Sequence, residues 1–131
     1  MKRIGLLLLL VVLASGSVWA QNKALSLDGD GDYVQVPEGV WFNGDLTIEA
    51  WVYVRKHSYW SRLISFANGE YNDNVLFALS NKVTGLPTFE IYRNVDSDNW
   101  DRTKVISEIP LEVNNWAHLA CTQVNKVGSV Y

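Results

Sequence analysis

The stretch from Ala24 to Val54 constrains the fold of this chain more than any other part of it. Apolar and polar side chains alternate there in two short runs, 24–27 and 33–36, and in one long run, 46–54. Successive side chains of a strand point to opposite faces of a sheet, so a period of two predicts half-buried antiparallel strands. The apolar side chains of the long run, which we expect to face the core, are Leu46, Ile48, Ala50, Val52 and Val54.

Further segments of the same kind follow along the chain. The pattern predicts strands over 62–67, 75–79, 88–92, 103–108 and 116–124, and the start of another over 128–131. Turn residues separate these segments, as at Asn43-Gly44 and Asn68-Gly69. Many short strands without a helical period predict one all-β domain, either a sandwich or a barrel.

Residues 1–20 have the pattern of a signal peptide. Lys2 and Arg3 precede an apolar run from Leu6 to Ala14, and Val18 and Ala20 occupy the positions that a signal peptidase inspects. An uncleaved signal anchor is the alternative, but a span of the bilayer needs about 20 apolar residues. We therefore expect the mature domain to comprise residues 21–131, secreted to the extracellular space or the periplasm and not inserted in a membrane after cleavage.

Charge and cysteine content narrow the possible partners. Without Lys2 and Arg3, nine basic residues remain against fourteen acidic ones, a net charge of −5. Nucleic-acid binding needs clustered Lys and Arg, so we expect no nucleic-acid partner. Cys121 is the one cysteine, so it is either buried and inert or paired with a cysteine of another chain.

The end of the sequence predicts a domain that is incomplete at its C-terminus. Ser129 to Tyr131 has the pattern of an opening strand, and no turn or partner segment follows it. A sandwich buries its apolar faces between two complete sheets. We therefore expect the natural protein to continue beyond residue 131.

Five blocks of the sequence resemble the LamG-like family (laminin G-like, concanavalin A-like). Residues 24–29 and 32–37 resemble the family's opening strands, and Leu46 to Val52 (LTIEAWV) resembles its "FTIEAWV" strand. Trp116 to Ala120 is similar to its "WHHVA" strand, and Ser129 to Tyr131 to the start of the next one. The blocks occur in family order across nearly the whole mature chain. The resemblance implies a two-sheet antiparallel jelly roll, usually a non-catalytic adhesion or carbohydrate-binding module of secreted proteins, with calcium in some members.

An acidic turn is the first candidate site. Asp28, Asp30 and Asp32 place three carboxylates within five residues, alternating with glycines. Calcium takes six to eight oxygen ligands of this kind, so the turn is a candidate calcium site, with Asp28 on the family's Asp-Gly position. The alternative is a hairpin turn whose Asp side chains accept hydrogen bonds from backbone amides. The EF-hand spacing is not met, because Tyr33 and Gly39 occupy the positions that need Gly and Glu.

The second candidate is the polar and aromatic face opposite the apolar stripe. Glu49, Trp51 and Tyr53 share that face of the long strand, and Trp116, His118 and Ala120 are expected outside on 116–124. A flat ring can stack on a pyranose while polar groups bond its hydroxyls, which makes Glu49, Trp51 and His118 candidate ligand-binding residues. The alternative is structural: Trp51 packs the sandwich or its covering loops, and Glu49 is a partner of His118 or of a backbone amide.

Three aromatic residues in predicted loops form the third candidate set. Tyr59 and Trp60 lie in the polar stretch 55–62, and Trp100 lies in the acidic stretch 96–101. Loops at the end of a sandwich often carry recognition, so these rings are either sugar platforms or lids over the core.

Catalytic motifs are missing from the sequence. Neither a Gly-x-Ser-x-Gly nor a His-Glu-x-x-His motif occurs, and the strand around Glu49 lacks a second acid for glycoside hydrolysis. We therefore expect a non-enzymatic module that binds a polysaccharide or the glycan of a glycoprotein. The alternative is a structural spacer of a larger secreted protein or an accessory domain of a glycoside hydrolase.

Overall fold

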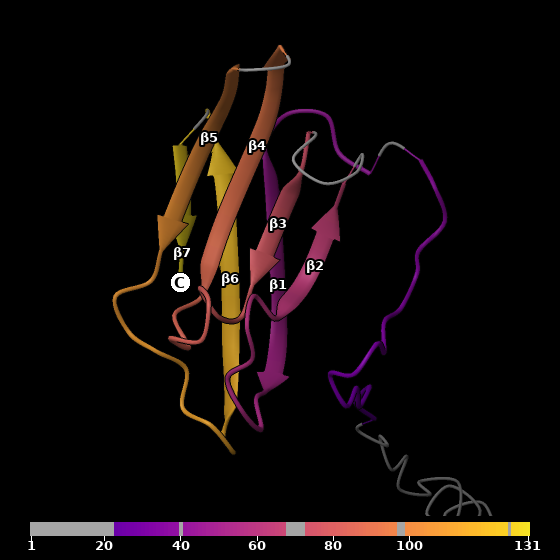
Figure 1. Cartoon of the computed structure of the whole chain (residues 1–131), viewed down its shortest axis with the longest axis vertical. Helices are drawn as coiled ribbons and strands as arrows, with labels where there is room; N and C mark the ends of the chain where they lie inside the picture. The colour runs from indigo at the N-terminus through magenta and orange to yellow at the C-terminus, as the bar shows by residue number, and fades with distance from the viewer. Residues whose placement is uncertain (1–22, 40, 68–72, 97–98, 126) are drawn as a thin grey trace, which may run out of the picture.

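The computed structural model describes residues 23–39, 41–67, 73–96, 99–125 and 127–131, arranged as two antiparallel sheets in two layers (Figure 1). The predicted signal peptide, 1–20, lies outside the described residues. All secondary structure in the described part is β-strand, which confirms the predicted all-β class.

The first layer is a three-stranded sheet in the order β1-β6-β7. Its strands are β1 (Leu46–Tyr53), β6 (Trp116–Val124) and β7 (Val127–Val130). Along β1 the even-numbered side chains are buried or half-buried and the odd-numbered ones are exposed, as the period of two predicts. Leu119 and Cys121 of β6 are buried, again as expected.

The second layer is a four-stranded sheet in which consecutive strands are neighbours. It contains β2 (Arg62–Phe66), β3 (Val75–Ala78), β4 (Thr88–Asp96) and β5 (Asn99–Ile106), in the order β2-β3-β4-β5. In Figure 1 β4 and β5 lie in front of β6 and β7. Strands that follow one another in the sequence usually lie next to each other in a sheet, and these four strands do so.

The core lies between the two layers. Val52, Leu119 and Cys121 from the three-stranded sheet join Phe77 and Phe89 from the four-stranded sheet in one cluster of buried side chains. At one point the layers approach closely. A Cβ built on Gly128 of β7 would lie 3.2 Å from Val105 Cγ2 and 3.4 Å from Phe89 Cδ1, so the lack of a side chain there lets the backbone of β7 rest on β4 and β5.

The two short N-terminal strands that the alternation predicts do not form. Segments 24–27 and 33–36 are extended but lie outside both sheets, and no strand of the described chain pairs with them (Figure 1). Their apolar side chains, such as Leu25 and Tyr33, are exposed. A strand is stabilised by ladder hydrogen bonds and by burial of one face, and these segments have neither.

The predicted loop 96–101 is also wrong in part. β4 continues past Tyr92 to Asp96, and β5 begins at Asn99, so Asn99 and Trp100 belong to a hairpin strand. The backbone of Trp100 is paired with that of Asn94. A polar composition does not prevent pairing in a tight hairpin, because backbone groups rather than side chains make the ladder.

Candidate functional site

The outer face of the three-stranded sheet brings together residues from two strands that are far apart in the sequence. The register of β1 and β6 places Trp51 opposite His118, Tyr53 opposite Trp116, and Glu49 opposite Ala120. Cross-strand partners point to the same face of a sheet. Because Val52 and Leu119 face the core, these residues face outward. We call Glu49, Trp51, Tyr53, Trp116 and His118 the aromatic face.

The rings of the aromatic face form two cross-strand pairs. The centroids of Trp51 and His118 are 5.2 Å apart at an interplanar angle of 46°, and those of Tyr53 and Trp116 are 5.6 Å apart at 60°. Both distances lie in the range of favourable ring contacts. The rings nevertheless stay accessible, since Trp51 is 67% and Trp116 is 51% exposed. The packing alternative for Trp51 is therefore not what this conformation shows.

Polar groups lie beside the Trp51 ring. His118 Nε2 and Glu49 Oε2 are 3.5 Å apart, and both side chains are exposed to solvent. Glu49 therefore lies within ion-pair distance of His118, and this contact is at the surface rather than in the core. The contact holds the His118 imidazole and the Glu49 carboxylate next to the Trp51 ring, and both remain exposed to solvent.

The aromatic face extends towards the chain end through Tyr131. Its backbone exchanges two hydrogen bonds with Ala120, at 3.0 and 2.8 Å, and its side chain is exposed. On its other side Ala120 pairs with Glu49 of β1. Glu49, Ala120 and Tyr131 therefore lie in one row across the sheet. Tyr53 and Trp116 are expected outside from the alternation, but neither they nor Tyr131 are among the ligand-binding residues predicted from the sequence. Only the strand register brings Trp116 to Tyr53.

The loop aromatics lie elsewhere. Trp60 covers Lys104, with the ammonium 4.6 Å from the ring centroid. Since Val105 faces the core side of β5, Lys104 and Trp60 lie on the outer side of the four-stranded sheet, across the sandwich from the aromatic face. Tyr59 is exposed beside Trp60. Trp100 is in β5, and its side chain is outside the described part. The structure does not bring the ring of Trp60 together with that of Trp51.

The acidic turn has the geometry of the turn alternative. Asp28 Oδ1 accepts a hydrogen bond from Asp30 N at 2.7 Å, and Asp32 Oδ2 accepts one from Asp28 N at 3.2 Å. Two of the three carboxylates are thus engaged with the backbone of the turn itself. In the part of the chain that the structure describes, no three His, Cys, Asp or Glu side chains are grouped to hold a metal ion. Calcium binding at this turn stays a prediction.

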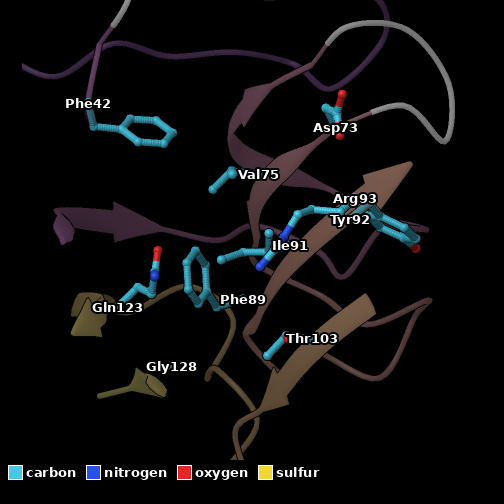
Figure 2. A pocket seen from close by; sticks show the side chains of 10 residues that line it. All are labelled: Phe42, Asp73, Val75, Phe89, Ile91, Tyr92, Arg93, Thr103, Gln123 and Gly128. Carbon is cyan, nitrogen blue, oxygen red and sulfur yellow. The ribbon is translucent and has the colours of Figure 1, made fainter. Parts of the chain in front are cut away.

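A cavity of about 260 Å³ lies between the layers (Figure 2). Phe89 and Ile91 of β4 line one side of it and Gln123 of β6 another. None of the residues singled out from the sequence lines this space. The exposed residues Asp73 and Arg93 also line the cavity, so it is open to solvent on one side. No residue of the aromatic face lines it.

The fold and the exposed aromatic face define an antiparallel β-sandwich of the kind found in lectins and other binding modules. A model of the concanavalin A-like lectin/glucanases superfamily, for laminin G-like domains, matches residues 28–131. The chain belongs to this family, and the resemblance seen in the sequence is confirmed. Domains of this type are typically non-catalytic binding modules and are commonly extracellular. Neither the curated proteins nor the solved structures include a match to the chain.

No helix in the described part of the chain has the length and apolar character needed to cross a membrane.

Proposed function

We propose that this domain is a secreted, non-catalytic module that binds carbohydrate on the outer face of its three-stranded sheet. The observation that carries the proposal is the pairing of Trp51 with His118 across β1 and β6, with Glu49 3.5 Å from the imidazole. The family and the signal-peptide pattern of residues 1–20 support a role outside the cell.

The composition of the face suits a sugar better than an apolar partner. Trp51 and Trp116 offer exposed indole rings against which the C–H face of a pyranose can stack. Glu49 accepts hydrogen bonds, and His118 both donates and accepts them, so each can bind hydroxyl groups at the ring edge. Binding sites for small molecules commonly combine apolar rings with a few convergent polar groups.

The arrangement of the ring pairs also favours an oligosaccharide over a monosaccharide as the ligand. Two ring pairs follow one another along β1 and β6, and Tyr131 extends the face towards β7. Among the described residues the face is open, without the enclosing walls that bury most of a small ligand. An oligosaccharide that contacts both ring pairs gains from each of them, whereas a monosaccharide contacts one.

The test is isothermal titration calorimetry of the chain with neutral oligosaccharides of increasing length. Affinity should rise until the ligand spans both ring pairs. Trp51→Ala removes a central anchor, and truncation of such an anchor typically costs ~2 kcal/mol, about 30-fold in Kd. Trp116→Ala should weaken the binding of long ligands more than that of short ones.

Tyr33→Ala is the matched control, because Tyr33 is as exposed as Trp51 but lies outside both sheets. It should leave Kd unchanged. The proposal fails if no member of a broad glycan array binds at high protein concentration, or if Tyr33→Ala weakens binding as much as Trp51→Ala. Silence on the array would favour the spacer alternative.

A further inference from the structure

The outer face of the four-stranded sheet carries a second, chemically different cluster. The register of β4 and β5 places Glu90 opposite Lys104 and Tyr92 opposite Arg102. Phe89 and Ile91 face the core side, so these four residues face away from it. We call Trp60, Tyr92, Arg102 and Lys104 the cationic face.

Lys104 is held in place by two neighbours. Its ammonium lies 4.6 Å from the centroid of the Trp60 ring, and Nζ donates a hydrogen bond to Asn81 Oδ1 at 3.3 Å. A cation over an indole ring is stabilised by the ring quadrupole. The loop that carries Trp60 is itself fixed, because Trp60 N donates to Lys82 O at 3.0 Å. The position of the charge is therefore set before any ligand arrives.

The buried carboxylate of Glu90 orients Arg102. Arg102 Nε lies 3.3 Å from Glu90 Oε1, and the Glu90 side chain is fully buried while that of Arg102 is 43% exposed. The guanidinium also lies 5.8 Å from the centroid of the Tyr92 ring. Burial raises the pKa of Tyr92, so its hydroxyl is protonated at neutral pH. The carboxylate fixes the guanidinium while leaving part of it open to solvent.

The described side chains of this face carry more positive than negative charge. Arg102 and Lys104 stand against the one buried carboxylate among them, Glu90. Arg62 of β2, which pairs with Ala78 of β3, is a further exposed cation on the same side of the sheet. The full sequence nevertheless has a net charge of −3. A positive region on an acidic protein attracts anionic ligands selectively.

We propose that the cationic face is a second binding site, for a sugar that carries a carboxylate or a sulfate. Lys104 and Arg102 bind the anionic group, for which charge-assisted hydrogen bonds are the strong interactions available. The half-buried Trp60 and the exposed Tyr59 that precedes it contact the pyranose ring. The site lies across the sandwich from the aromatic face and does not depend on the function proposed for that face.

The test uses three probes on the purified chain: an oligogalacturonate, a heparin-derived oligosaccharide and a neutral cello-oligosaccharide of the same length. The first two carry mainly carboxylates and mainly sulfates, so they distinguish the two anionic groups. At least one of them should bind, with an affinity that falls as salt is raised from ~0.05 to ~0.3 M. The neutral probe should not bind at this face.

Lys104→Gln is the decisive variant, because it removes the charge and leaves Glu90 paired with Arg102. It should weaken binding of the anionic probe about 10-fold, as expected for loss of one charge-assisted contact. Lys23→Gln removes the same charge from the N-terminal segment, and Trp51→Ala removes an anchor of the aromatic face. Both should leave the anionic Kd unchanged.

A thermal unfolding scan of each variant separates loss of binding from loss of fold. If Lys104→Gln has a lowered Tm, Trp60→Phe is the second variant, because it keeps a ring over Lys104. Trp60→Phe should also weaken binding of the anionic probe. The proposal is overturned if neither anionic probe binds, if Lys104→Gln and Lys23→Gln bind equally, or if a single-stranded oligonucleotide competes as well as the sugars.

Discussion

The imidazole of His57 lies directly against the backbone of Gly85. A Cβ built on Gly85 would be 2.5 Å from His57 Cε1, and Gly85 has a φ of +74°. The residue is also held on both sides, since its N–H donates to Ser80 Oγ and its carbonyl accepts from Leu111 N, each at 2.9 Å. The loop that follows β3 can pack on the loop that follows β1 only because position 85 has no side chain.

Gly85→Ala should therefore destabilise the domain by about 2–5 kcal/mol. Left-handed backbone costs ~1–2 kcal/mol for a residue with a Cβ, and overpacking against His57 adds ~1–3 kcal/mol. Urea denaturation followed by tryptophan fluorescence measures the loss. Gly29→Ala is the control, because Gly29 has a similar φ of +82° but nothing within 4 Å of its Cβ position. Equal losses for the two variants would show that the contact with His57 carries no energy.

The second prediction concerns Cys121, which is fully buried at the centre of the core. Burial raises the pKa of this thiol from 9.0 to about 12, since desolvation disfavours the thiolate. The folded state therefore binds this proton more tightly than the unfolded state does. Its contribution to stability is complete below pH 9 and is lost as the pH rises from 9 towards 12.

The pH dependence of urea denaturation tests this sign. Between pH 9 and 11 the wild-type chain should lose more stability per pH unit than Cys121→Ala does, because the variant has no thiol to ionise. Thiol-specific labelling at neutral pH should be slow in the folded chain and fast in urea. Rapid labelling of the folded chain would contradict the burial of Cys121 and show a thiol accessible to a cysteine of another chain.

The third prediction separates the two interpretations of the acidic turn. Asp28→Ala removes the acceptor for Asp30 N and should cost about 0.5–1.5 kcal/mol, whereas Asp28→Asn keeps an acceptor oxygen and should cost less. Calcium should leave the Tm of both variants and of the wild-type chain unchanged. A calcium-dependent rise in Tm that Asp28→Asn abolishes would instead support a calcium site, formed after the carboxylates leave the backbone amides.

The sequence predicts best where a strand has one face in the core. β1 and β6 are found almost at their predicted bounds. In both strands a residue on the core face alternates with one on the outer face, as Ile48 does with Glu49 and Leu119 with His118. Every strand with one face in the core of a sandwich has this alternation. Two of the five blocks that carry the family resemblance lie in these strands. The outward orientation of the residues of the aromatic face was predictable from the same alternation.

Two kinds of information were not accessible from local pattern. The pairing of Trp51 with His118 and of Tyr53 with Trp116 depends on strand register, which is set by contacts between distant segments. The segments 24–27 and 33–36 alternate like strands, but alternation does not supply a neighbour to pair with. The cationic face could not be predicted from the sequence because it also depends on strand register. Only the register of β4 and β5 places Glu90 beside Lys104.

The two sheets differ in how their strands follow one another. β2, β3, β4 and β5 pair in chain order, whereas β1 pairs with β6, which the ribosome makes only after all four of those strands. Nearby pairings form quickly and distant ones slowly, so we expect the four-stranded sheet to assemble first and β1 to find β6 in the closing step. During synthesis the cationic cluster would then exist before the Trp51–His118 pair does, and ligand capture by that pair would report that folding has finished.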